Sequence, residues 1–267
     1  MSLARELAVV RAFLRVGTVG ALTYRAEALV WLLSTTMPLI MMAFFGAVAA
    51  DGAIGRYGER EIVGYFLATF IVRSLTASWI SWQINLDIRA GSIASRLLLP
   101  AHPLLGYATE SVGAMPVRVL GSVVVAAIML ALLGRGAVTG DPVLLGLACV
   151  SVTLAWLLSL AVSATIGALA FFVGSSAKVM DAWLAGLFVF SGYLVPLDLF
   201  PAAARPWLDW LPFRYQIGLP VELLVGALDR PRAASLMARQ LAFVLAAGLT
   251  TLVVWRRGLA RFSAHGG

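Results

Sequence analysis

The sequence predicts an all-α polytopic membrane protein with six transmembrane helices, and three observations carry this prediction. First, 61% of the 267 residues are hydrophobic and 12% are charged, whereas soluble domains average about 45–50% and about 25%. Second, apolar runs near the length of about 20 residues that crosses a bilayer recur along the chain. Third, the apolar stretch 190–220 contains five prolines, so it cannot form one straight helix. We expect it to leave the membrane core and fold back at its surface, as a re-entrant segment before the last span. The length suits a single membrane domain, 1–267.

Residues 1–25 are predicted to form an interfacial amphipathic helix. Apolar residues recur at three- and four-residue spacing, and arginines interrupt them: Leu3, Leu7, Val10 and Leu14, with Arg5, Arg11 and Arg15. Such a segment is too polar to span a bilayer. The arginines also argue against a cleavable signal, which needs an unbroken apolar core. A solvated helix packed on a partner is the alternative.

The six spans follow from the uncharged runs. We expect them at about 28–50, 62–82, 119–133, 142–172, 182–195 and 236–255. Glu110 and Pro116 interrupt the approach to the third span, which predicts an interfacial helix that turns or kinks into it. A tight polar turn is expected at 174–181. The fifth span is short because the proline-broken segment follows it.

Residues 83–103 form a polar-to-amphipathic connection after the second span. Asp87, Arg89 and Arg96 supply its charges, and Pro100 and Pro103 end it. We expect a short helix along the membrane surface, with an ordinary loop as the alternative.

An arginine, Arg73, lies near the middle of the second predicted span. A charged residue there costs roughly 2.5–3.5 kcal/mol on insertion scales, so it should face protein or water. Two interpretations stay open: a buried pair with a carboxylate of a neighbouring helix, and a residue that lines a path through the membrane.

Lysine and arginine counts set the expected orientation. The bias between the two sides is slight over all loops and becomes clear when the fold-back region, 190–232, is set aside. We therefore expect both termini in the cytoplasm and the fold-back region on the outer side. The expected location is the plasma membrane, as a multi-pass protein.

Motifs for chemistry are absent from the sequence. It holds no G-x-x-x-x-G-K-[ST] loop, and the segment 174–178 has only a superficial likeness to one. His102 and His265 lack the neighbours of a metal site. No serine, and not the single Cys149, sits in a nucleophile motif. The arginines are scattered, which argues against nucleic-acid binding. We expect no metal or cofactor in this chain.

Two local patterns bear on a family. One is Arg89-Ala-Gly91-Ser-Ile93 followed by Leu97-Leu98-Leu99-Pro100. The other, before the last span, comprises Ser191-Gly192, Pro196, Phe200-Pro201, Leu211-Pro212-Phe213, Tyr215 and Pro220. With the order of the spans, they resemble the permease subunit of an ABC-2 type exporter, in its two-permease branch. The resemblance covers nearly the whole chain.

The resemblance implies partners and site residues. Family permeases pair, as identical or related subunits, on two cytosolic ATPases that bind ATP and Mg. The segment 83–103 then matches a coupling helix, with ATPase-coupling residues Asp87, Arg89, Gly91, Arg96 and Pro100. A path or gate would draw on Arg73, Glu110 and Arg118. The outer fold-back would be shaped by Gly192, Pro196, Pro201, Pro212, Tyr215 and Pro220.

The resemblance implies ATP-driven export of an amphipathic or hydrophobic substrate, in contact with membrane lipid. Two other classes stay open. One is a membrane-embedded lipid-modifying enzyme that uses Glu110 or Asp87, and the other is a non-transport assembly protein in which the fold-back only packs against a partner.

Overall fold

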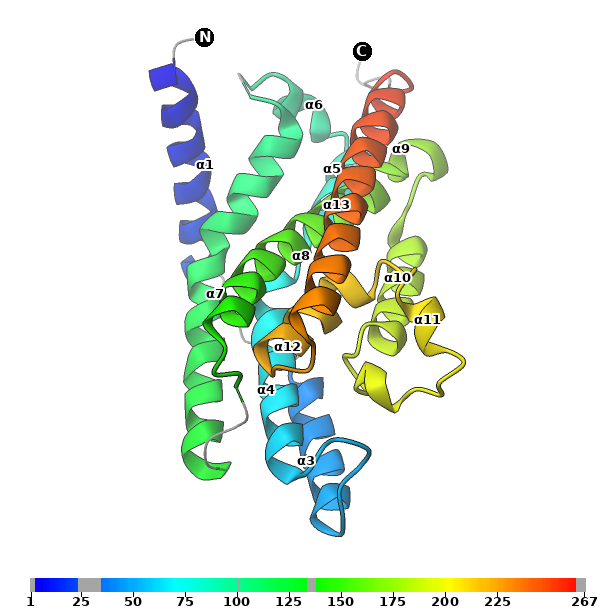
Figure 1. The fold of residues 1–267 in the computed structure, drawn as a ribbon. Helices are drawn as coiled ribbons and strands as arrows, with labels where there is room; N and C mark the ends of the chain where they lie inside the picture. The colour runs from blue at the N-terminus through cyan, green and yellow to red at the C-terminus, as the bar shows by residue number, and fades with distance from the viewer. Residues whose placement is uncertain (1–2, 24–34, 100, 134–137, 263–267) are drawn as a thin grey trace.

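The computed structural model describes residues 3–23, 35–99, 101–133 and 138–262. These residues fold into helices joined by turns, with one isolated bridge between Ile54 and Tyr57 (Figure 1). Within these described residues, four segments are long and apolar enough to cross a membrane: Glu59–Arg89, Pro103–Ile128, Pro142–Val173 and Arg230–Leu259. The predicted all-α membrane fold is confirmed at this level, while the total of six spans stays a prediction.

The helix α4 (Glu59–Thr76) forms the centre of the bundle, because its apolar residues are buried on every side. Each residue from Ile62 to Phe70 is buried. The preceding helix, α3 (Met37–Ala50), packs against it, with the rings of Phe45 and Phe66 stacked at 5.6 Å. Of the first predicted span, residues 28–34 lie outside the described part of the chain.

The second predicted span is interrupted. Ala77 adopts an extended conformation, so α4 ends and α5 (Ile80–Arg89) begins after a short break. A hydroxyl from the neighbouring α8 (Pro142–Ala168) compensates for part of this break, because Ser163 Oγ donates to the carbonyl oxygen of Ser78 at 3.4 Å. Buried backbone groups need such partners in a membrane. The break is therefore supported by α8.

The long helix α7 (Pro103–Leu133) continues through Pro116 as one helix, so the chain does not turn between two separate helices there, while the alternative of a kink at Pro116 stays a prediction. Beside it lies α1 (Leu3–Thr23), which confirms a helix within 1–25. The two backbones meet closely at Gly17 and Gly113, where an added Cβ atom would overlap a carbonyl oxygen of the other helix. Thr18 Oγ1 also donates to Gly113 O at 2.8 Å. The placement of α1 in the membrane surface stays a prediction.

Two further long helices, α8 and α13 (Arg230–Leu259), pack along each other. Each is preceded by an aspartate whose side chain accepts a hydrogen bond from a backbone N–H of the first turn, and each has a proline in that turn. Both residue types are common at the N-termini of helices. Inside the pair, Ser151 Oγ donates to Gln240 Oε1 at 3.0 Å. The helix α13 contains the predicted sixth span, and α8 covers the predicted fourth span up to residue 168.

Next come α9 (Ala170–Val173) and α10 (Ala177–Phe190). The expected polar turn at 174–181 is wrong beyond residue 176, because Lys178 and Asp181 lie on the exposed side of α10, where they pair at 3.6 Å. The predicted fifth span shifts accordingly toward the N-terminus.

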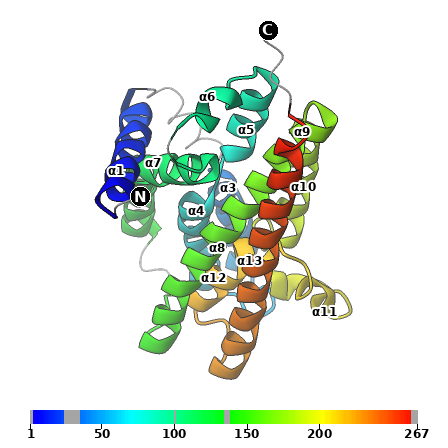
Figure 2. The same cartoon turned by 90° about the horizontal axis from the view of Figure 1, so that it is seen from above.

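Between α10 and α13 the chain forms only short elements: η1 (Leu197–Leu199), α11 (Arg205–Leu208), η2 (Arg214–Gln216) and α12 (Gly218–Leu224). The start of α1, the end of α13 and the α5–α6 turn lie at one end of the bundle, whereas α12 packs against α4 and α8 and α11 lies at the side of the bundle (Figure 1). Seen from above, α1 and α7 occupy one side and α10 and α11 the other (Figure 2).

Candidate functional site

The first candidate site is the elbow, which comprises α5, α6 (Ile93–Leu97) and residues 103–110 of α7. Arg96 lies at its centre. The Arg96 Nε donates to Asp87 Oδ2 at 2.8 Å, and Nη1 donates to Glu110 Oε1 at 2.8 Å. One guanidinium group thus ties together three consecutive helices.

Two other side chains complete the binding of Asp87. Tyr107 Oη donates to Asp87 Oδ2 at 2.6 Å, and Ser92 Oγ donates to Oδ1 at 2.8 Å. The Tyr107 ring also lies 4.2 Å from the Arg96 guanidinium carbon, in a cation–π contact. Burial alone would lower the pKa of Arg96, but the hydrogen bond to Glu110 and the adjacent negative charges outweigh burial and raise it. The elbow is therefore held together by a charged Arg96 whose hydrogen-bond partners all lie within the elbow.

The outward surface of the elbow is mainly apolar. Leu98 is 87% exposed and Leu86 is 64% exposed, next to the exposed Arg89. Gly91 makes the turn between α5 and α6 with φ +74, a left-handed conformation that favours glycine. Of the predicted coupling residues, Arg89 and Gly91 face outward, Asp87 and Arg96 bind within the chain, and Pro100 lies outside the described residues.

The three predicted path residues are not brought together. Glu110 joins the elbow, where Arg96 binds it, and its backbone carbonyl lies against Gly17 of α1. Arg73 lies on α4, near Tyr193, and no carboxylate of the described residues is within ion-pair distance of it. Arg118 lies on α7 among the residues whose side chains are not described.

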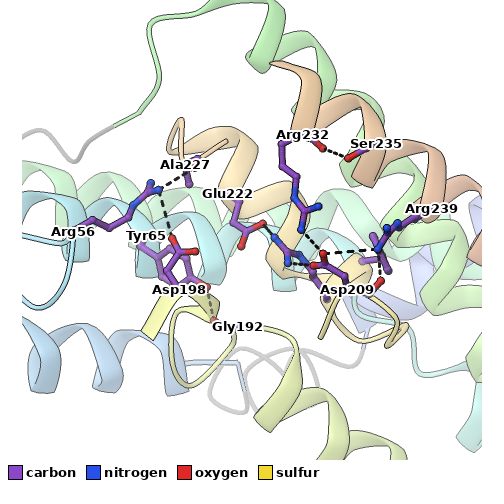
Figure 3. A network of polar contacts seen from close by, with 12 residues as sticks. Arg56, Tyr65, Gly192, Asp198, Asp209, Glu222, Ala227, Arg232, Ser235 and Arg239 are labelled. Carbon is purple, nitrogen blue, oxygen red and sulfur yellow. Dashed lines mark hydrogen bonds and ion pairs between the residues drawn. The ribbon is translucent and has the colours of Figure 1, made fainter. Parts of the chain in front are cut away.

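The second candidate site is the fold-back network between α11 and α13 (Figure 3). Asp209 accepts from both Arg214 and Arg232, and Arg239 Nη1 lies 3.8 Å from the same carboxylate. Arg214 Nη2 also donates to Glu222 Oε2 at 2.6 Å. Asp209, Arg214 and Glu222 are each at most 7% exposed.

This buried network is electrostatically coupled. Burial alone would lower the pKa of Arg214, but Glu222 and Asp209 outweigh this effect and raise it. Sequence reasoning missed the network, although Asp209, Arg214 and Glu222 are charged residues within an otherwise apolar segment, and that composition was the available signal.

The predicted fold-back residues shape the backbone around this network. Gly192 adopts φ +87, and its carbonyl accepts a hydrogen bond from Tyr65 Oη of α4 at 2.8 Å. Tyr215 is fully buried and donates to the Asp209 carbonyl at 2.6 Å. The prolines lie in turns or at the starts of short helices, where the backbone N–H that proline lacks is not needed. Pro196 precedes η1, Pro201 and Pro212 lie in turns, and Pro220 lies in the first turn of α12.

Comparison with known proteins identifies a family. No curated protein matches the chain. The profile of a family described as "ABC-2 family transporter protein" matches residues 12–266, which include all the long helices after α1, the elbow and the fold-back network. A match over this share of the chain agrees with the apolar helical bundle found here. The chain therefore belongs to the ABC-2 family of transporter proteins, whose members are membrane permeases of ABC transporters.

Proposed function

We propose that this chain is the transmembrane permease subunit of an ATP-driven ABC exporter that moves an amphipathic or hydrophobic substrate. It would work with separate cytosolic ATPase subunits, which bind ATP and Mg, and with a second permease. It would cross the bacterial inner membrane six times, with both termini in the cytoplasm and the fold-back region as an outer re-entrant segment.

This proposal rests on the elbow, which has exposed apolar side chains and internal ion pairs that join several helices. Its exposed side chains include Leu86 and Leu98, which are apolar, and Arg89, and apolar side chains exposed together can mark an interaction site. The surface lies at the end of the bundle that also holds both termini (Figure 1). A partner that docks there would contact α5 and α6 directly.

The elbow can pass a displacement into the bundle. Arg96 binds Asp87 of α5 and Glu110 of α7, and the backbone of Glu110 touches α1 at Gly17. A push on α6 would therefore move α5, α7 and α1 together. For ATP to bias this motion, the docked and released states must differ in their contacts. At the far side, Tyr65 connects α4 to the fold-back at Gly192, and the fold-back would respond as a lid.

Arg73 belongs to this proposal as a candidate path residue. It is a cation on a central helix, with no carboxylate partner among the residues that the structure describes. Glu110 would act as a coupling residue, because its carboxylate is bound by Arg96. Arg96 binds both Asp87 and Glu110, and this supports a structural role of the two carboxylates over a role as acid or base of a lipid-modifying enzyme.

The test is permease-dependent ATPase activity after reconstitution with the ATPase encoded nearest to this chain. The double variant Arg89→Glu with Leu98→Ser alters only exposed side chains of the elbow, so we expect a several-fold loss of stimulation with an unchanged melting temperature. Arg60→Glu, an exposed arginine in the first turn of α4, is the matched control. Unaltered stimulation in the double variant would contradict docking at the elbow.

A further inference from the structure

We propose that the fold-back holds a binding site for a phosphate-bearing anion, the headgroup of a membrane amphiphile. A pocket of about 470 Å³ lies between η1, α11 and the start of α13. This volume falls in the range of about 300–1,000 Å³ that small-molecule sites occupy. Arg205, Arg214 and Arg232 line it, with Asp198 and Asp209. The proposal does not depend on transport or on an ATPase.

The two carboxylates in the pocket are already bound by groups of the chain. Asp209 accepts from Arg214 and Arg232, so both of its oxygens have cationic partners (Figure 3). Asp198 Oδ2 accepts from Tyr57 Oη at 3.0 Å and lies 3.5 Å from Arg56 Nη1. An incoming anion would therefore meet carboxylates that are each already paired with at least one arginine.

Several guanidinium nitrogens in the same pocket have no hydrogen-bond acceptor among the described residues. Arg205 is exposed, and its Nε donates to the Phe200 carbonyl at 2.9 Å, while its two terminal nitrogens have no acceptor among the described residues. The Arg232 side chain is 45% exposed and uses Nη2 for Asp209. Arg214 Nε is buried without a hydrogen-bond partner. Guanidinium groups present forked donors that match phosphate oxygens.

The surroundings of the pocket favour a headgroup over a free ion. Trp207 of α11 is 73% exposed and Trp210 is 67% exposed, and the ring of Trp210 lies 4.6 Å from the Arg239 guanidinium carbon. Exposed tryptophans in membrane proteins concentrate at the level of the lipid headgroups. A basic pocket beside them would lie at the same depth as lipid phosphates, and basic residues near the surface attract anionic lipids.

Equilibrium binding to the purified full chain in a neutral detergent tests this proposal. The probes are short-chain phosphatidylglycerol, short-chain phosphatidylcholine and inorganic phosphate. We expect phosphatidylglycerol to bind most tightly and Arg205→Gln to weaken it about tenfold, the effect of losing one charged hydrogen bond. Arg60→Gln removes the same charge outside the pocket and should have no effect. Arg205→Lys keeps the charge without the fork and should fall between them.

Three results would overturn the proposal. Equal affinity for the two lipids would exclude an anionic site. Equal binding by Arg205→Gln and Arg60→Gln would place any anion elsewhere. Inorganic phosphate that binds as tightly as phosphatidylglycerol would exclude a headgroup site in favour of a free-ion site. Arg205 is the residue of choice because it is exposed and bound only by a carbonyl oxygen, so its replacement leaves the buried network intact.

Discussion

At the scale of single residues, Arg96 shows how one side chain can define a junction of helices. Its guanidinium group joins Asp87 and Glu110, which lie on α5 and α7, and Tyr107 covers it. The Arg96 side chain is 23% exposed, so water screens these contacts only partly. Arg89, seven residues earlier in the same connection, is exposed and makes no ion pair with a described residue.

We expect Arg96→Ala to lower the free energy of unfolding, since it removes the ion-pair partner of Glu110 and leaves Asp87 bound only by Tyr107 and Ser92. Hydrogen bonds to charged groups contribute about 1.5–3 kcal/mol each, and partial exposure reduces this, so the expected loss is about 2 kcal/mol in total. Arg89→Ala should change stability by less than about 0.5 kcal/mol. Thermal or denaturant unfolding of the purified protein measures both. Equal stability of the two variants would show that the Arg96 contacts contribute nothing.

At the scale of elements, the close crossing of α1 and α7 depends on two glycines, which have no side chain to hold the backbones apart. Gly17 and Gly113 bring the two backbones into contact, and Thr18 adds a hydrogen bond across the crossing. Small residues allow helices in membranes to approach closely and pack. This crossing fixes α1 beside the turn of α7 that carries Glu110.

The α1 helix offers a matched pair of glycines to test the crossing. At Gly17 an added Cβ atom would overlap the Glu110 carbonyl, whereas at Gly20 nothing lies within 4 Å of it. We expect Gly17→Ala to destabilise the protein by about 1–3 kcal/mol, as overpacking does. Gly20→Ala should be neutral or stabilise by up to about 1 kcal/mol through helix propensity. Unfolding measurements on both variants decide this, and a neutral Gly17→Ala would refute the close contact.

The elements that the sequence predicts best are those with continuous apolar runs and clear starts. Pro142 begins a long apolar run and lies in the first turn of α8, so this span was predicted nearly to its ends. The start of α10 was misplaced because Lys178 and Asp181 look like a polar turn, although one exposed side of a helix accommodates both. The break after Ala77 was not predicted, because the support it receives from Ser163 comes from a distant part of the chain.

The sites were less predictable than the helices, because their contacts also join residues that are distant in the sequence. Asp87, Arg96 and Glu110 were each recognised as notable, but two prolines separate Glu110 from the other two, and only the folded chain shows that Arg96 binds both. A charge in an apolar segment can be identified from sequence. Its partner depends on how the elements pack.

At the scale of the whole molecule, the bundle has two distinct ends. Both termini and the elbow lie at one of them, and the loop between α3 and α4 lies at the other (Figure 1). Exposed apolar side chains line α13, including Leu241, Leu245 and Leu249 at four-residue spacing. Such a stripe is suited to contact with lipid or with another membrane helix.

Labelling of single cysteines in intact cells tests the orientation of these ends. Cys149 is exposed and must first be replaced, for example by alanine. We expect Arg60→Cys, near the α3–α4 loop, to react with a membrane-impermeant maleimide added outside the cells. Arg257→Cys, in the last turn of α13, should react only after the membrane is opened. The reverse pattern would show that the termini face outward.

The shared carboxylate of Asp209 limits how this sequence can diverge. Because Asp209 binds Arg214 and Arg232 and lies near Arg239, its loss alone would leave the buried Arg214 with Glu222 as its only remaining carboxylate partner. Removing one partner from a buried ion-pair network is strongly unfavourable, because the remaining charges are then only partly compensated. Substitutions at these positions are therefore expected to accumulate as a group, and the signature of the fold-back among homologues should be covariation between 209, 214, 222 and 232.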